Sequence, residues 1–388
     1  MGKIKLGIIG IGNMGSNYAS KVFHGECPDF ELVAVADINP KRLVWAEENL
    51  DDSVKRFATA EEMLDSGMLD ACMVETPHYD HPHYVIECIK RGIHVMTDKP
   101  AGVYTKQVRE MNEYAKQHPE VVFGVMFNQR TNCVYKKMRE LVQSGKYGNI
   151  RRTNWIITDW YRPQVYYDSG NWRATWAGEG GGVLLNQCPH QLDLWQWICG
   201  MPKKVYASMK FGKWHDVEVE DDVTCFVEYE NGATGTFITT TGDACGSNRF
   251  EIQMDKAKLL VEHNQLHVWE FEMTEQEFSR TNTSPFGYPK AEEIKVELDG
   301  ENPQHVGVIN AWGKAILEGT SMVADGAEGI NGLMLSNAMH LSGFTGKTVE
   351  LPFDEDLYYA ELEKRIKSSK KKERVVEITA KMDQSWRR

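Results

Sequence analysis

The chain has 388 residues, of which 44 are Lys or Arg and 56 are Asp or Glu, so its net charge is −12. This length allows two domains, each with its own core. The acidic balance disfavours nucleic acid and anionic membranes as partners. No apolar run reaches the length of a membrane span, so we expect neither partner.

The cysteines and the N-terminus indicate a compartment. The eight cysteines are scattered without a C-x-x-C pair, a pattern typical of reduced thiols in a cytosol and not of a disulfide framework. The chain begins directly in an apolar stretch without a secretory signal. We therefore expect a cytoplasmic protein.

Expected strands and helices alternate over the first 126 residues. The strands are expected at Lys3–Ile9, Glu31–Ala36, Leu69–Glu75, His94–Thr97 and Val121–Met126, and helices at Thr59–Asp65, Pro82–Arg91 and Thr105–Gln117. This alternation predicts a doubly wound parallel sheet with right-handed crossovers, an N-terminal Rossmann domain over residues 1–126.

A glycine motif follows the first expected strand. Residues 10–15 read Gly-Ile-Gly-Asn-Met-Gly, and Asp37 ends the second strand 22 residues later. The glycines allow a tight turn, close approach of a pyrophosphate and packing of helix on strand. Asp37 can bond the ribose hydroxyls and repels a 2′-phosphate, which favours NAD. Lys41 and Arg42 leave NADP as the less favoured cofactor.

The character of the chain changes after residue 128. Helices are expected at Thr131–Ser144, near Pro189, at Val306–Leu317 and at Gly326–His340, and strands at Arg151–Trp160, Val205–Phe211, Thr224–Tyr229, Thr234–Thr241, Phe250–Met254, Leu259–Glu262 and His267–Phe271. Asn231-Gly232 is a good hairpin turn. The pattern predicts an α+β domain with a large, mostly antiparallel sheet over residues 127–352, followed by a charged tail over 353–388.

Four motifs in this order carry a family resemblance. They are the glycine motif, Thr76-Pro77-His78-Tyr79-Asp80-His81, Asp98-Lys99-Pro100, and Gly180-Gly181-Gly182 followed by His190 and Asp193. Over roughly residues 3–352 the chain resembles the glucose–fructose oxidoreductase / inositol dehydrogenase / MocA family. The resemblance implies a Rossmann domain and an open antiparallel sheet. It also implies NAD(P)-dependent oxidation or reduction of sugars or polyols, and homo-oligomers, dimers or tetramers, formed through that sheet.

The resemblance also implies a catalytic pair. Lys99 matches the lysine of the family's Glu-Lys-Pro motif, with Asp98 in place of the glutamate, and His190 matches its second catalytic residue. The family usually has an aspartate four residues before that histidine, where this chain has Asn186. Lys99 and His190 therefore remain as the acid/base pair. Either could take the proton of the substrate hydroxyl.

Ligands of parallel α/β sheets bind at the carboxyl ends of the strands. Together with the family motifs, this gives the residues expected at the cofactor: Gly10, Gly12, Asn13, Met14, Gly15, Asp37, Thr76, Pro77, His78, His81, Asp98, Lys99 and Asn128. The close spacing of His78, His81 and His83 raises the question of a metal site. They show no open three-ligand pattern, and we expect no metal.

The loop over Asp159–Gly182 is rich in aromatic residues. Aromatic faces suit the C–H faces of sugar rings, and we expect substrate contacts from Asn186, Trp160, Tyr161, Arg162, Trp172 and Arg173. The alternative for these aromatics, and for the nearby Tyr166, Tyr167 and Trp176, is ordinary core or subunit contact.

Three functions follow from these observations. The first is an NAD-dependent oxidoreductase acting on a secondary hydroxyl, or the corresponding ketone, of a sugar, sugar derivative, glycoside or cyclitol. The second is a glycoside-cleaving enzyme that oxidises C3 transiently, eliminates the aglycone and returns the hydride. The third is a non-catalytic NAD-binding sensor, which the missing aspartate at position 186 motivates.

Overall fold

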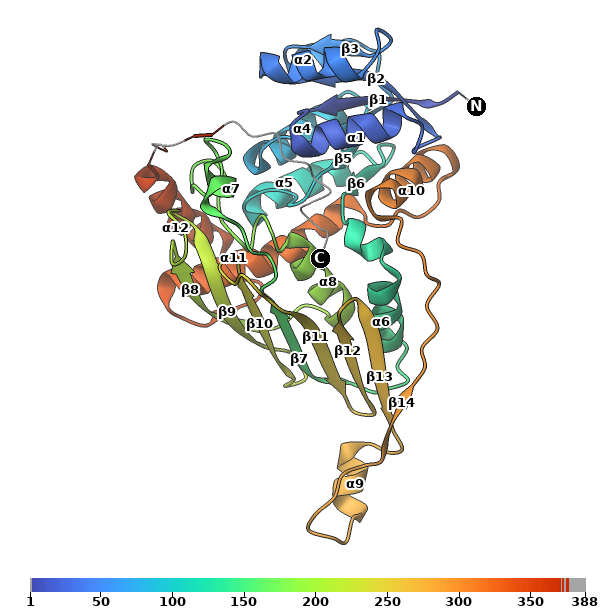
Figure 1. Cartoon of the computed structure of the whole chain (residues 1–388), viewed down its shortest axis with the longest axis vertical. Coiled ribbons are helices and arrows are strands. Elements are labelled where there is room, and N and C mark those ends of the chain that lie inside the picture. Colours follow the sequence, from blue (N-terminus) through green and yellow to red (C-terminus); the bar gives the residue numbers. More distant parts are fainter. Residues whose placement is uncertain (1, 371, 373–374, 377–388) are drawn as a thin grey trace.

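The computed structural model describes residues 2–370, 372 and 375–376. The fold is built on two sheets, one of six strands and one of nine. Figure 1 shows the six-stranded sheet and its helices at the top, in blue and cyan, and the nine-stranded sheet below. The predicted fold class, α/β with a second, mostly antiparallel sheet, is confirmed.

The N-terminal sheet is parallel throughout. Its order is β3-β2-β1-β4-β5-β6, with β1 at Ile4–Ile9, β2 at Phe30–Ala36, β3 at Lys55–Phe57, β4 at Ala71–Val74, β5 at His94–Thr97 and β6 at Phe123–Val125. The crossover helices include α1 at Asn13–Phe23, α2 at Pro40–Asn49, α3 at Ala60–Leu64, α4 at His81–Lys90 and α5 at Thr105–Lys116. The strand order reverses between β1 and β4, and ligands of such sheets bind at that crevice.

The second sheet has the order β14-β13-β12-β11-β7-β10-β9-β8-β15. Its strands are β7 Ile150–Ile157, β8 Lys204–Phe211, β9 Glu220–Glu228, β10 Thr234–Thr240, β11 Asn248–Met254, β12 Ala257–Glu262, β13 Gln265–Phe271, β14 Ala291–Ile294 and β15 Val349–Glu350. Every neighbouring pair is antiparallel except β7 with β10. The hairpin between β9 and β10 turns at Gly232, as the sequence predicts.

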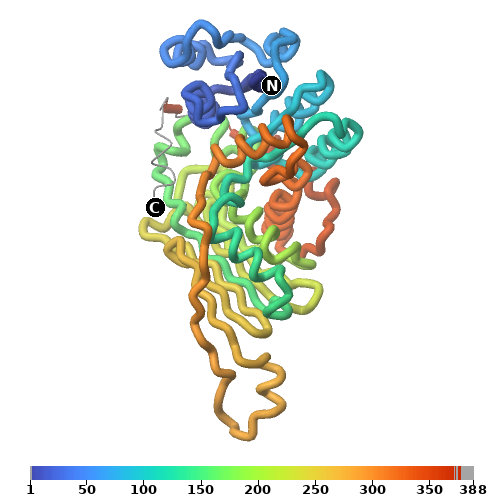
Figure 2. The backbone as a smooth tube through the Cα atoms, turned by 90° about the vertical axis from the view of Figure 1, so that its right-hand side faces the viewer, coloured from blue at the N-terminus to red at the C-terminus, as the bar shows by residue number. Residues whose placement is uncertain are grey.

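Helices cover one face of this sheet. They are α6 at Cys133–Gln143, α8 at Pro189–Cys199 and α11 at Gly329–Thr345, and Figure 2 shows them on one side of the sheet. On the other face, Tyr206 and Phe226 are paired across β8 and β9 and both are exposed. The expected oligomer through this sheet stays a prediction.

A later segment of the chain returns to the N-terminal domain. Helix α10, Gln304–Glu318, lies beside the parallel sheet and not beside the nine-stranded one (Figures 1 and 2). Its Trp312 is buried, stacks on Phe30 at a ring-centroid distance of 5.2 Å and donates a hydrogen bond to the Val122 carbonyl. Residues that we placed in the second domain therefore complete the core of the first.

Two other segments lie at the periphery. The hairpin β13–β14 carries α9, Glu275–Thr281, and extends away from the body (Figure 1). Helix α9 buries no residue, and Phe286 and Tyr288 are each 84% exposed. Part of the predicted tail forms α12, Glu355–Ser368, which is anchored to α5 by an ion pair between Arg109 and Glu355. Residues 377–388 of that tail lie outside the described residues.

Two expectations from the sequence concern membrane spans and cysteines. None of the helices in the described part of the chain is both long and apolar enough to cross a membrane. All eight cysteines fall within the described residues, and each of them is free.

Candidate active site

The glycine motif forms the turn between β1 and α1. A Cβ atom at Gly15 would lie 1.9 Å from the Gly10 carbonyl oxygen, so this position tolerates only glycine. A Cβ at Gly12 would meet nothing within 4 Å, and Gly12 stands at the N-terminus of α1 without a side-chain cap. Open space in front of a helix N-terminus suits a pyrophosphate.

Asp37 lies beside this turn at the end of β2. Its Oδ2 accepts a hydrogen bond of 2.9 Å from the Ile11 backbone N–H, and its Oδ1 accepts one of 2.8 Å from that of Asn39. The carboxylate is therefore held next to the glycine motif, where a ribose joined to the pyrophosphate would reach it.

Several polar side chains near the strand ends have buried atoms without a partner. Among the described residues, no hydrogen bond reaches Asn13 Oδ1, Thr76 Oγ1, His78 Nδ1 or Asn128 Oδ1. Asn13 begins α1, Thr76 follows β4, and Asn128 follows β6. A buried polar group without a partner costs about 1–3 kcal/mol. Such groups around one edge of the sheet fit a dinucleotide that would bond them.

Some residues expected at the cofactor have all their polar side-chain atoms in hydrogen-bond contact, and His81 is one of them. The ring of His81 is buried, and its two nitrogens lie 2.8 and 2.7 Å from the carbonyl oxygens of Pro100 and Thr76. Because both nitrogens are engaged, His81 ties these two loops together, and its expected contact with the cofactor stays a prediction. Pro77 is exposed and Met14 half-buried at the same edge.

Lys99 bridges the two domains. It follows β5, and its Nζ donates a hydrogen bond of 2.9 Å to the backbone carbonyl of Asn186, in the turn before α8. Asp98 accepts a hydrogen bond from the Lys99 backbone N–H at 2.8 Å. The side chain of Lys99 is therefore positioned at the carboxyl edge of the parallel sheet before any ligand binds.

His190 lies in the first turn of α8, close to Lys99. Its Nδ1 is buried without a partner in the described structure, and its ring meets Phe127 edge-on at 6.4 Å. Burial lowers the pKa of His190 well below its usual value, and the positive charges of Lys99 and His305 add to the effect. The neutral imidazole, which can accept a proton, is thus the favoured form.

Three further ionisable side chains converge behind Lys99. Burial, followed by the negative charge of Asp98, raises the pKa of Glu75 well above its usual value. Burial also lowers the pKa of His305 to about 4, with Asp98 opposing the shift. The His305 ring lies 5.6 Å from that of Tyr18. The pKa of Tyr18 is raised by burial and by Asp98 and Glu75.

These groups escape prediction from the sequence for different reasons. Glu75 directly precedes Thr76 at a strand end, a signal that could have identified it. His305 and Gln304 come from α10 and reach the site only because that helix folds back. The Gln304 Oε1 accepts a hydrogen bond of 2.5 Å from the Asn128 amide. No local sequence pattern predicts this contact, because Asn128 and Gln304 are 176 positions apart in the chain.

Polar side chains from the aromatic loop lie beside Asn186. Tyr166 accepts hydrogen bonds from Arg173 at 3.1 Å and from Gln187 at 3.2 Å. The Arg173 guanidinium also lies 4.5 Å from the centre of the Trp172 ring, and Trp172 meets His78 edge-on at 5.6 Å. Trp172 and Arg173 are therefore close to both the expected cofactor edge and Asn186.

The rest of the aromatic loop divides into rim and core. Arg162 lies over the rings of Trp160 and Tyr166, at 5.4 and 5.1 Å, and Tyr161 is exposed. Trp176 is buried against His340 and Phe344. Tyr167 is also buried and donates its hydroxyl to Thr241. These two aromatics belong to the core, as the alternative interpretation held.

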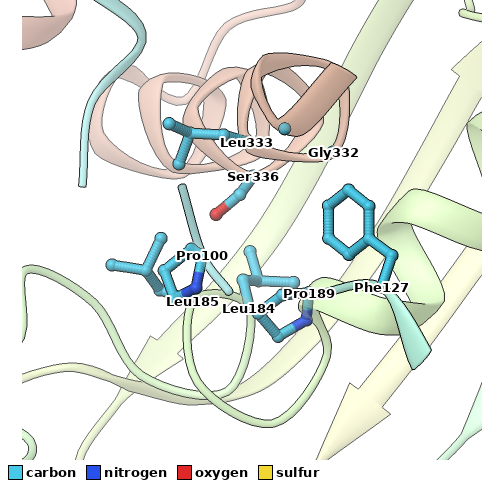
Figure 3. A pocket seen from close by; sticks show the side chains of 9 residues that line it. Pro100, Phe127, Leu184, Leu185, Pro189, Gly332, Leu333 and Ser336 are labelled. Carbon is cyan, nitrogen blue, oxygen red and sulfur yellow. The ribbon is translucent and has the colours of Figure 1, made fainter. Parts of the chain in front are cut away.

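A small apolar pocket lies behind the catalytic edge. Figure 3 shows Pro100, Leu184, Leu185, Pro189 and Phe127 facing Leu333 and Ser336 of α11. Its free volume of about 10 Å³ is close to the space that one water molecule requires. The pocket is therefore a packing joint between Pro100 and the turn that carries Asn186, and it is too small to hold a sugar ring.

The glycine motif, Asp37 and the unpartnered polar atoms define a dinucleotide-binding domain, with Lys99 and His190 beside it. Residues 4–126 match the oxidoreductase family with an NAD-binding Rossmann fold, and residues 135–260 match the GFO/IDH/MocA C-terminal domain. The chain thus belongs to the GFO/IDH/MocA family and is an NAD-binding oxidoreductase. The resemblance and the choice of NAD made from the sequence are confirmed.

Individual relatives are more distant. The rhizopine catabolism protein MocA of Rhizobium meliloti is 27% identical over 201 residues, which are 52% of this chain and 58% of that protein. The myo-inositol 2-dehydrogenase of Thermotoga maritima is 25% identical over 268 residues, 67% of this chain and 75% of that protein. The chain thus spans little more than half the length of the first relative.

A solved structure is similar over almost the whole chain. The WlbA dehydrogenase from Chromobacterium violaceum, in complex with NADH and UDP-GlcNAcA, superposes with a TM-score of 0.76 at 27% identity. The match covers 91% of this chain and 97% of that one. The likeness therefore includes both sheets, and not the dinucleotide-binding domain alone.

Proposed function

We propose that this protein is an NAD-dependent dehydrogenase that transfers a hydride between the nicotinamide and a secondary hydroxyl, or the corresponding ketone, of a sugar, sugar derivative or cyclitol. The observation that carries the proposal is the 2.9 Å hydrogen bond by which Lys99 is held at the nucleotide-binding edge. The names of the relatives, an inositol dehydrogenase and a dehydrogenase bound to a nucleotide sugar, support the substrate class.

The chain's own residues divide the work. The glycine motif and Asp37 would hold NAD, which would supply the hydride acceptor. Lys99 donates a hydrogen bond to the substrate hydroxyl and holds its oxygen, and the neutral His190 takes the proton as the carbonyl forms. Asn186, Trp172 and Arg173 hold the neighbouring part of the substrate. The aromatic face and the fixed amide and guanidinium groups suit a ring bearing several hydroxyls.

The direct test is a panel of monosaccharides, inositols, uronic acids and nucleotide sugars with NAD or NADP, followed by the absorbance of NADH. We expect turnover of at least one secondary alcohol, with NAD preferred. The Lys99→Ala variant serves as the matched control for contaminating activity. Failure of the wild type across the panel in both directions would remove the proposal.

A second candidate is supported by the rim of the site. Arg162 lies over the rings of both Trp160 and Tyr166, and all three side chains are partly exposed. Such a rim would suit a glycoside whose C3 is oxidised transiently, whose aglycone is eliminated and to which the hydride is returned. This enzyme would release aglycone from a glycoside without net NADH. Accumulation of keto-sugar and NADH in equal amounts would exclude it.

A further inference from the structure

We propose that Glu179 supplies the carboxylate missing at position 186 and is the positioning residue for Asn186 in the proposed dehydrogenase reaction. The Asn186 side chain donates through its Nδ2 to Oε1 of Glu179, seven residues earlier in the chain. Asn186 also accepts the Lys99 hydrogen bond on its backbone carbonyl. The inference rests on the proposed function, because Asn186 is taken to face the substrate.

The Glu179 carboxylate is held on several sides. Its side chain is 3% exposed, and its Oε2 accepts a hydrogen bond of 2.5 Å from the Ala174 backbone N–H. An Arg173 guanidinium nitrogen lies 3.9 Å from Oε1, and the Glu179 backbone N–H donates to the Thr175 carbonyl at 2.9 Å. A buried carboxylate with these partners has one position, so it can fix the group that bonds it.

That contact decides which way the Asn186 amide points. A carboxylate accepts and does not donate, so the amide nitrogen must face Glu179 and the amide oxygen must face away. Asn186 is only partly buried, so its Oδ1 can accept a hydrogen bond from a substrate hydroxyl. Asn186 with Glu179 thus presents the acceptor that an aspartate at position 186 would present by itself.

The two positions should therefore be coupled. With Asp at position 186, two carboxylates would face each other at hydrogen-bond distance, which disfavours having both charged. With Gln at position 179, the Asn186 amide would turn over and present its nitrogen to the substrate. With both changes, the carboxylate now at position 186 would accept from the amide now at position 179. The oxygen of that amide would still accept from the Ala174 backbone N–H, so the hydrogen bond is restored with its donor and acceptor exchanged.

The experiment is a double-mutant cycle with Glu179→Gln, Asn186→Asp and the double variant. Each single change is expected to lower kcat/KM by about tenfold or more, with the Kd for NAD changed less than about twofold. The double variant is expected to return to within about threefold of the wild type. If Glu179 has no role beyond structure, the two losses of kcat/KM should multiply, and the double variant should show no rescue.

Glu218→Gln is the matched control. Glu218 accepts a hydrogen bond from Trp176 N–H in the same loop and does not bond Asn186. We expect Glu218→Gln to leave kcat/KM near the wild-type value and to give no rescue of Asn186→Asp. Rescue by this change as well, or no rescue by Glu179→Gln, would overturn the inference.

Melting temperatures of the wild type, the two single variants of the cycle and the double variant, all without ligand, separate this inference from the proposed function. If no alcohol is turned over but the double variant melts closer to the wild type than the sum of the single shifts, the pairing stands and the proposed function falls. If the Tm shifts simply add, the pairing is wrong even when the wild type is an active dehydrogenase.

Discussion

The ammonium group of Lys99 reaches out of the dinucleotide-binding domain and donates to the backbone carbonyl of Asn186 in the other domain. A lysine in water loses most of its rotamer freedom when it is ordered, at a cost of up to about 2 kcal/mol. Here that ordering is complete before a substrate arrives. A ligand hydroxyl near Asn186 therefore meets a fixed donor, which is the requirement for a positioned catalytic group.

Replacing Lys99 should damage the reaction and spare the cofactor. Lys99→Ala is expected to lower kcat by about 10²–10⁴, the range for losing a positioned acid/base group. The Kd for NAD should change little, because the glycine motif after β1 and Asp37 after β2 are expected to carry most of the cofactor binding. Steady-state kinetics and NAD titration by fluorescence measure the two quantities, and a near wild-type kcat would contradict the mechanism.

Lys99 and His190 are expected to act on one proton. His190→Ala should then lower kcat by a similar or smaller factor than Lys99→Ala. The double variant should be little worse than the weaker of the two single variants, because residues that act as a unit are not additive. Losses that multiply in the double variant would show that the two side chains serve separate steps.

Asp37 should govern the choice of cofactor. Asp37→Ala would remove the expected charge-assisted hydrogen bond to the ribose, worth roughly 1.5–3 kcal/mol, and also removes the acceptor of the Ile11 backbone N–H. We expect the Kd for NAD to rise about tenfold or more and the relative use of NADP to improve. Asp70→Ala, which removes a carboxylate bonded to the Lys5 backbone elsewhere in the sheet, is the control and should leave both unchanged.

Two glycines of the same motif should fail in different ways. Gly12→Ala places its Cβ in open space, so the apoprotein Tm should stay within a few degrees of the wild type while NAD binding is lost by about tenfold or more. Gly15→Ala drives its Cβ against the Gly10 carbonyl and should destabilise the fold itself. Thermal melts with and without NAD compare them. Unchanged NAD affinity in Gly12→Ala would place the pyrophosphate elsewhere.

His305 should make the apoprotein sensitive to acid. Its pKa is about 4 in the fold, against roughly 6.5 in the unfolded chain, so the unfolded state takes up the proton first as the pH falls. This contribution is absent above about pH 6.5 and destabilises the native state by about 2 kcal/mol near pH 5.

His305→Gln should therefore flatten the fall in stability between about pH 7 and pH 5, measured by urea unfolding of the apoprotein. His83→Gln is the control, since His83 is exposed on α4. That variant should follow the wild-type pH dependence. An equal fall in stability for His305→Gln would show that His78 and His190 carry the acid sensitivity instead.

The sequence predicted elements best where the pattern was local and regular. The strand at His94–Thr97 was predicted with its observed bounds, and the strand before the glycine motif differed by one residue. Elements with weak patterns were missed. The strand at Lys55–Phe57 is three residues long with two charged residues, and the helix at Glu355–Ser368 buries only Tyr358 and Leu362, so its charged residues dominate the pattern and predict a tail.

Only those site residues that lie in sequence motifs could be predicted from the sequence. Lys99, His190 and Asp37 lie in motifs whose spacing fixes their place in the fold. Glu179 precedes a run of glycines, and nothing in its neighbours shows that it meets Asn186. The absence of an aspartate at position 186 motivates the sensor hypothesis, which stays a prediction; the proposed pairing of Glu179 with Asn186 would place a carboxylate beside that position.

Helix α10 has a consequence for how this chain can be divided. The polypeptide leaves the dinucleotide-binding half, builds most of the nine-stranded sheet, returns with Trp312 and His305, and leaves again for α11. A fragment ending at residue 126 would lack the indole that covers Phe30 and the imidazole near Asp98. The dinucleotide-binding half is thus built from two separate segments of the chain. A single crossover therefore cannot exchange it for the corresponding half of a relative.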